Sequence, residues 1–168
     1  MAHAATLRRF FLVDQSLVPF GINFVLNGAI AYAINRNATS IPFAGQSSIV
    51  GDTVITSFLL PFITCLIVTA LIQKQISGGK LGAFASVPDA GLGGFLAARG
   101  NALRGALIGI AAIALVAVPT LLALGALGVD ELARDAFLWF KAAYAGALAA
   151  LVQPLIAWLA LMPRASAA

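Results

Sequence analysis

Four stretches of mainly apolar residues, each about 20 residues long or longer, occupy most of this chain. Their approximate bounds are residues 10–34, 53–72, 103–127 and 137–162. A helix of this length is long enough to cross the hydrocarbon core of a bilayer. The pattern therefore predicts an all-α fold, a four-helix transmembrane bundle that forms a single domain over residues 1–168.

Each predicted span contains an internal proline, which changes the expected shape of the bundle. Proline lacks a backbone N–H and clashes with the carbonyl four residues earlier, so we expect kinked spans. Short loops follow the first and third spans, and they predict two antiparallel hairpins. The four prolines are Pro19, Pro61, Pro119 and Pro154.

The composition agrees with a membrane protein and limits the available chemistry. Hydrophobic residues make up 61% and charged residues 10% of the chain, whereas roughly a quarter of a soluble domain is charged. Cys65 is the one cysteine and His3 the one histidine, which excludes an intramolecular disulfide and a bis-histidine metal or haem site. We expect no metal or cofactor. The basic residues flank the spans, so they indicate topology and no nucleic-acid partner.

The distribution of basic residues predicts the orientation. Seven lie on one side of the predicted spans and three on the other. The positive-inside rule then places both termini and the glycine-rich connector 74–102 in the cytoplasm. The alanine-rich, compact chain is typical of a bacterial protein, which predicts a multi-pass protein of the inner (plasma) membrane. The two sets are Arg8, Arg9, Lys74, Lys80, Arg99, Arg104 and Arg164, against Arg36, Arg134 and Lys141.

Three local expectations concern residues near the ends of the spans. Asp52 follows Gly51 directly before the second span and is expected to cap that helix. Lys141 lies near the outer edge of the fourth span, so its ammonium is expected to extend to the interface. The connector 74–102 is expected to be a flexible linker that lies on the membrane surface.

The first span carries polar side chains on one face. They recur every four residues, so a helix brings them into one stripe. Because hydrocarbon offers them no hydrogen bonds, this face must meet protein or a wet cavity. Hydroxyls of the second span are the expected partners. The candidate polar path or ligand site comprises Asp14, Gln15, Asn23, Asn27, Ser57, Thr64 and Gln153. The alternative, that these residues only bond the helices together, stays open.

The third and fourth spans carry small residues at intervals of four, which predict close helix packing. We expect this packing either within one protomer or between protomers. Leu148, between two of these positions, is expected to face lipid. The predicted packing residues are Gly105, Gly109, Ala142, Gly146 and Ala150.

These observations favour a non-enzymatic protein, although they leave its enzymatic status open. We expect a channel or transporter-like unit, or an accessory subunit of a membrane complex. In the lipid bilayer, we expect the protein to form a homo-oligomer or to be part of a larger assembly. No catalytic residue is assigned, because no span contains a deep glutamate, histidine or arginine. The alternative is a membrane enzyme that acts on a lipid or isoprenoid at the cytoplasmic face through Asp14 and Asp89.

Overall fold

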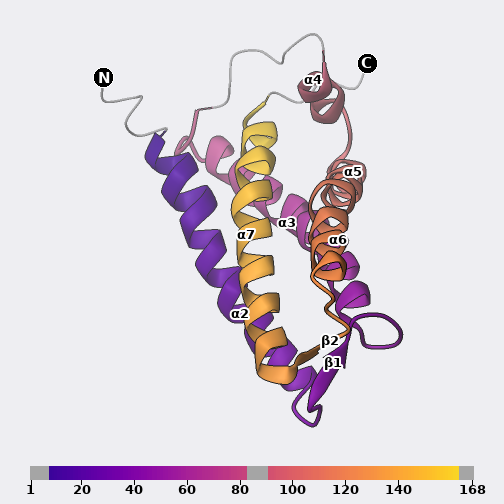
Figure 1. Ribbon diagram of the computed structural model, residues 1–168. Coiled ribbons are helices and arrows are strands. Elements are labelled where there is room, and N and C mark those ends of the chain that lie inside the picture. Colours follow the sequence, from indigo (N-terminus) through magenta and orange to yellow (C-terminus); the bar gives the residue numbers. More distant parts are fainter. Residues whose placement is uncertain (1–7, 83–90, 163–168) are drawn as a thin grey trace.

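The structure, a computed structural model, describes residues 8–82 and 91–162 and is mostly helical (Figure 1). Within these residues, four helical segments are long and apolar enough to cross a membrane. Two short strands accompany them, so the fold is not purely helical. The elements are η1 (Phe10–Leu17), α2 (Val18–Ile34), β1 (Ser40–Pro42), α3 (Ile49–Ser77), α4 (Leu92–Ala97), α5 (Asn101–Ala112), η2 (Ile113–Ala117), α6 (Val118–Ala126), β2 (Glu131–Ala133) and α7 (Arg134–Leu161).

The start of α3 differs from the prediction. The helix begins at Ile49, and the hydroxyl of Ser48 accepts a hydrogen bond of 3.2 Å from the backbone N–H of Gly51. Ser48 is therefore the N-cap, and the expectation for Asp52 was wrong. Asp52 lies in the first turn of the helix, where a carboxylate is stabilised by the helix dipole.

The prolines occur in two local settings. Pro19 and Pro119 lie at the second positions of α2 and α6, each directly after a π-helical segment, η1 or η2. A π-helical turn changes the local hydrogen-bond pattern at the point where proline cannot donate. Pro61 and Pro154 instead lie inside the α-helices α3 and α7.

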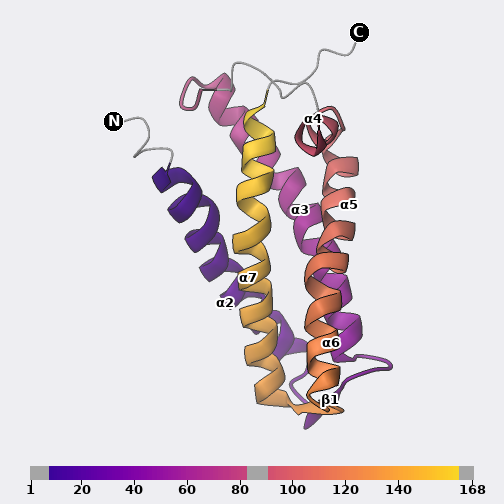
Figure 2. The same cartoon turned by 45° about the horizontal axis from the view of Figure 1, so that its top comes forward.

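Helix α7 occupies the centre of the bundle (Figures 1 and 2). Its main neighbours are α2 on one side and α3 on the other, and α3 in turn packs against α5. The main packing pairs therefore join helices of different predicted hairpins rather than the two members of each hairpin. The largest buried cluster combines side chains of α7 with those of α3, α4 and α5.

Two glycines of α5 lie directly against the backbone of α3. A Cβ atom added at Gly109 would be 2.8 Å from the carbonyl oxygen of Phe58, and one at Gly105 would be 3.0 Å from that of Phe62. Backbone atoms on an adjoining helix cannot move aside cheaply. Any larger residue at either position would push α5 away from α3.

At the interface between α2 and α7, one glycine likewise lies directly against the backbone of the other helix. A Cβ atom at Gly146 would be 3.0 Å from the carbonyl oxygen of Phe20, and one at Gly28 would be 3.3 Å from the Cβ of Ala142. Ala150 is half-buried one turn further along α7. These contacts are all within one protomer.

The expectation that Leu148 faces lipid was wrong. Its exposed fraction is 0%, and it belongs to the same buried cluster as Leu60 and Ile108. The reason is the central position of α7, because a helix with neighbours on several sides buries residues outside its small-residue stripe as well.

The loops at one end of the bundle are joined by a two-stranded antiparallel sheet. Ile41 of β1 pairs with Leu132 of β2, so the loop before α3 is bonded to the loop before α7. The hydroxyl of Ser40 also donates to a carboxylate oxygen of Glu131 at 2.8 Å. Both ends of the described chain lie at the opposite end of the bundle, which is also the end that carries α4 (Figure 1).

Part of the predicted linker 74–102 is ordered helix. α3 continues to Ser77, and α4 forms a further helical turn that packs against α7. Arg104 of α5 is only 3% exposed, and its guanidinium donates to the carbonyls of Leu96, Ala97 and Arg99 at 3.1–3.2 Å. This side chain fixes the C-terminal end of α4. Residues 83–90 of the predicted linker, which include Asp89, lie outside the described residues.

Candidate functional site

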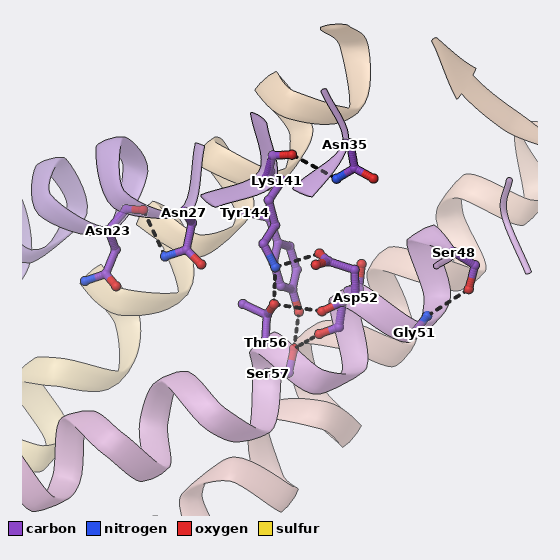
Figure 3. Close-up of polar contacts among 12 residues, drawn as sticks. Asn23, Asn27, Asn35, Ser48, Gly51, Asp52, Thr56, Ser57, Lys141 and Tyr144 are labelled. Carbon is purple, nitrogen blue, oxygen red and sulfur yellow. Dashed lines mark hydrogen bonds and ion pairs between the residues drawn. The ribbon is translucent and has the colours of Figure 1, made fainter. Parts of the chain in front are cut away.

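A buried lysine is the most unusual group in this bundle. Lys141 is the eighth residue of α7, and its side chain is 6% exposed. Its ammonium is 2.6 Å from the Oδ2 atom of Asp52, and it also donates to the hydroxyl of Thr56 (Figure 3). The expectation that Lys141 extends to the interface was wrong, because it turns inward to a carboxylate on α3.

Local helical geometry places both partners of this lysine on one face of α3. Asp52 and Thr56 are four residues apart, so they lie one turn apart on the same side. The hydroxyl of Thr56 donates to the carbonyl oxygen of Asp52 at 2.7 Å, which leaves its lone pairs directed toward the ammonium. The carboxylate itself remains 34% exposed, so it is the accessible member of the ion pair.

A second polar layer lies one turn deeper in the bundle. The hydroxyls of Ser57 and Tyr144 are 2.5 Å apart, and Ser57 donates to the carbonyl of Thr53 at 2.8 Å. All three residues are buried. Within the described residues, the hydroxyl oxygen of Thr53 has no hydrogen-bond partner. This layer joins α3 to α7 directly below the ion pair.

The ion pair lines a groove between α2, the start of α3 and α7. Its volume is about 340 Å³. Polar and apolar side chains both line it, and its charged residues are Asp52 and Lys141. Asn27 brings one residue of the predicted polar stripe into the same groove. The lining residues are Asn27, Ile30, Ala31, Ile34, Asn35, Ser47, Ser48, Gly51, Asp52, Ile55, Phe137 and Lys141.

The amides of the stripe differ in their partners. Gln153 of α7 donates to the side-chain oxygen of Gln15 at 3.3 Å, so one amide pair does cross between helices. Asn23 and Asn27 instead donate to carbonyls of their own helix, those of Pro19 and Asn23, at 3.0 Å each. The expected partner helix was wrong for Gln15, because η1, which carries it, packs mainly against α7 and not against α3.

The other predicted site residues do not gather in the groove. Asp14 is exposed on η1, and Thr64 is half-buried on α3. Ser57 belongs to the buried layer with Tyr144 rather than to the lining of the groove. The groove therefore includes Asn27 from the predicted set, together with Asp52, which was expected to be an N-cap, and Lys141, which was expected to extend to the interface.

The missed ion pair did leave a signal in the sequence. Asp52 and Lys141 are 89 residues apart, but both lie near the same predicted edge of the membrane. Opposite charges at equal depth in two spans are strong candidates for pairing, because hydrocarbon disfavours either charge alone.

Comparisons of the chain with protein-family models, with curated proteins and with solved structures found no match. Among the described residues, no group of histidine, cysteine, aspartate or glutamate side chains is placed to hold a metal ion. The side chains that line the groove offer one ammonium, one carboxylate, amides and hydroxyls.

Proposed function

We propose that this chain is a small multi-pass membrane protein that admits a small polar solute to the groove between α2, α3 and α7, as a channel or transporter-like unit. Four long apolar helices support the membrane setting. The proposal includes proline-bent spans in which each span runs antiparallel to the next, although the spans of one predicted hairpin pack mainly against those of the other. It also includes the orientation expected from the basic residues, in which the end with β1 and β2 faces outward and both termini lie in the cytoplasm of a bacterium.

The buried ion pair is the observation that carries this proposal. Charged side chains within membrane spans are costly, and they commonly mark a pathway or binding site. A pair that served only to hold α3 and α7 together gains little over apolar packing, because desolvation offsets most of the Coulomb attraction. A one-third-exposed carboxylate beside a polar groove favours a site that water and solutes reach.

A second candidate function rests on the exposure of α2. Its buried residues are Pro19 and Ala31, and large apolar side chains such as Val25 and Ile22 are more than half exposed. A helix covered so little by its own chain supports association with further membrane helices, either in a homo-oligomer or in a larger complex. Copurification in mild detergent, followed by identification of all bound proteins, separates this accessory role from an independent transporter.

Water access to the groove tests the leading proposal. In a Cys65→Ala background, Asn27→Cys should react with a charged, membrane-impermeant thiol reagent added from outside. Ile22→Cys, on the same helix but 59% exposed on its apolar surface, is the matched control and should stay unreactive in lipid. A groove that is dry would leave both cysteines unmodified, and the solute-site proposal would then fail.

The orientation is tested with the same chemistry. Cysteines at Asn37 and Glu131, in the loops beside the sheet, should be modified from outside intact cells. A cysteine at Gly79, after the end of α3, should react only after the membrane is opened. The reverse pattern would invert the proposed topology but not the groove.

A further inference from the structure

We infer that the groove selects a small zwitterion, a molecule that carries an anionic group and an ammonium group a few bonds apart. The anionic group would bind Lys141, and the ammonium would bind Asp52. This inference rests on the proposed function, because it names the class of solute that the groove accepts. It depends on the charges, hydrogen-bonding capacity and lining of the site.

The charge balance of the groove favours a ligand with no net charge. The charged residues of its lining are one cation and one anion, only 2.6 Å apart. A purely anionic or purely cationic ligand would add a net charge to a groove that its own ion pair leaves neutral, and it would be attracted by one member of the pair and repelled by the other. A zwitterion completes an alternating set of four charges, in which every charge has opposite neighbours.

The hydrogen bonds of the ion pair leave room for this arrangement. An ammonium has three N–H donors, and Lys141 uses two of them toward Asp52 and Thr56. The third can bind a ligand carboxylate or phosphate without breaking the ion pair. A carboxylate accepts up to about four hydrogen bonds, and the exposed fraction of Asp52 makes it reachable by a ligand ammonium.

Asn27 provides an additional polar contact on the opposite wall. Its side-chain nitrogen donates to the carbonyl of Asn23, so its oxygen is the atom that can accept from a ligand ammonium. This contact comes from α2, whereas Asp52 comes from α3. A ligand held by both would therefore bridge two helices.

The apolar part of the lining indicates that the ligand also carries a hydrocarbon group. Branched or aromatic hydrocarbon faces the groove from all three helices, at Ile34, Ile55 and Phe137. An amino acid with an apolar side chain matches this combination, and so does the phosphate and ammonium of an ethanolamine phospholipid. The shared chemistry is a zwitterionic group attached to hydrocarbon, and the experiment distinguishes the two sources.

Protection of a cysteine in the groove tests this inference. Ser47→Cys, in a Cys65→Ala background, places a thiol on the lining away from the proposed charge contacts. Its rate of maleimide labelling in detergent is measured against concentration of leucine, of isopentylamine, which lacks the carboxylate, and of 4-methylpentanoate, which lacks the amine. Gln46→Cys, outside the lining, is the control for effects unrelated to the groove.

We expect leucine to protect at a concentration at least about tenfold lower than either analogue, because each charged hydrogen bond contributes about a decade of affinity or more. For a lipid source, lysophosphatidylethanolamine protects in place of leucine, and lysophosphatidylglycerol does not. A singly charged probe that protects as well as its zwitterionic counterpart overturns the inference, as does a complete lack of protection. If Asn27→Cys is still labelled from outside, the proposed solute site survives that result.

Two variants give an independent check on the roles of the charges. Asp52→Asn should shift the preference from leucine toward 4-methylpentanoate, and Lys141→Met should shift it toward isopentylamine. Asp135→Asn, an exposed acid on α7, should keep the preference for leucine. An unchanged preference in both site variants overturns the assignment of the charges. The wild-type comparison decides the ligand class without requiring either variant to fold.

Discussion

Two cations are buried at opposite ends of the bundle, and the protein holds them in different ways. Arg104 donates to three main-chain carbonyls at the end of α4. Lys141 binds a side-chain carboxylate and a hydroxyl beside the groove. Main-chain carbonyls are fixed by the helix to which they belong, so Arg104 completes the fold. The carboxylate that binds Lys141 is one-third exposed, so that end can exchange partners with a solute.

Among the variants that test this comparison, the largest loss of stability is expected from removing the negative charge beside Lys141. Asp52→Asn leaves an ammonium buried without a counter-charge, which we expect to cost about 3 kcal/mol of folding free energy. Thermal melting in detergent measures the loss. Asp135→Asn, which removes an acid exposed to solvent, is the control and should melt close to the wild type.

Arg104→Met should cause the next largest loss of stability, and that loss should be confined to the other end of the bundle. It removes charged hydrogen bonds to the end of α4, which contribute about 2 kcal/mol. We expect hydrogen exchange to increase most at Leu92–Ala97, while the amides of α7 near Lys141 keep their protection. Arg99→Met, at an exposed arginine stacked on Phe95, is the matched control. Equal loss of protection at both ends would show that α4 is not held locally.

Lys141→Met should destabilise less than Asp52→Asn, although both break the same ion pair. Methionine fills the buried space with apolar atoms, and the remaining carboxylate can be hydrated through the groove. We expect a loss of about 1 kcal/mol, mostly from the bond to Thr56. Melting curves of the two variants under identical detergent conditions reveal the asymmetry. If Lys141→Met proves the more harmful change, the groove does not hydrate Asp52.

The smallest effect is expected from the hydroxyl layer below the ion pair. Tyr144→Phe removes the bond to Ser57, which keeps its other bond to the carbonyl of Thr53. The expected cost is therefore below about 1 kcal/mol. Zwitterion binding should stay at the wild-type level, because Tyr144 does not line the groove. A large loss of binding would extend the site inward to this layer.

The sequence predicted the positions of the long helices better than it predicted which helices pack against each other. Apolar length depends on local composition, and helices occupy all four predicted segments, with α3 running from Ile49 to Ser77 instead of 53–72. The central place of α7 depends on which helices pack together, which the hydrophobic pattern does not encode. For that reason Leu148 was expected at the lipid surface although it is buried.

The candidate site was predictable only in part, for a similar physical reason. The i, i+4 periodicity of the stripe is a property of a single helix, and Asn27 from that stripe lines the groove. The ion pair depends on the distance between α3 and α7. α4 was missed because glycines such as Gly93 indicate flexibility in sequence, whereas here Gly93 provides space for the ring of Trp158.

The self-bonded amides of α2 have a consequence for biogenesis. α2 finds its main partner in α7, which leaves the ribosome after α3, α5 and α6, and β1 must likewise wait for β2. For a chain that enters a bilayer helix by helix, α2 spends that interval without its neighbour. Because Asn23 and Asn27 already donate to carbonyls of their own helix, they reduce the desolvation cost of waiting in lipid. The same two bonds that keep Asn23 and Asn27 from bonding to other helices allow α2 to be synthesised well before α7.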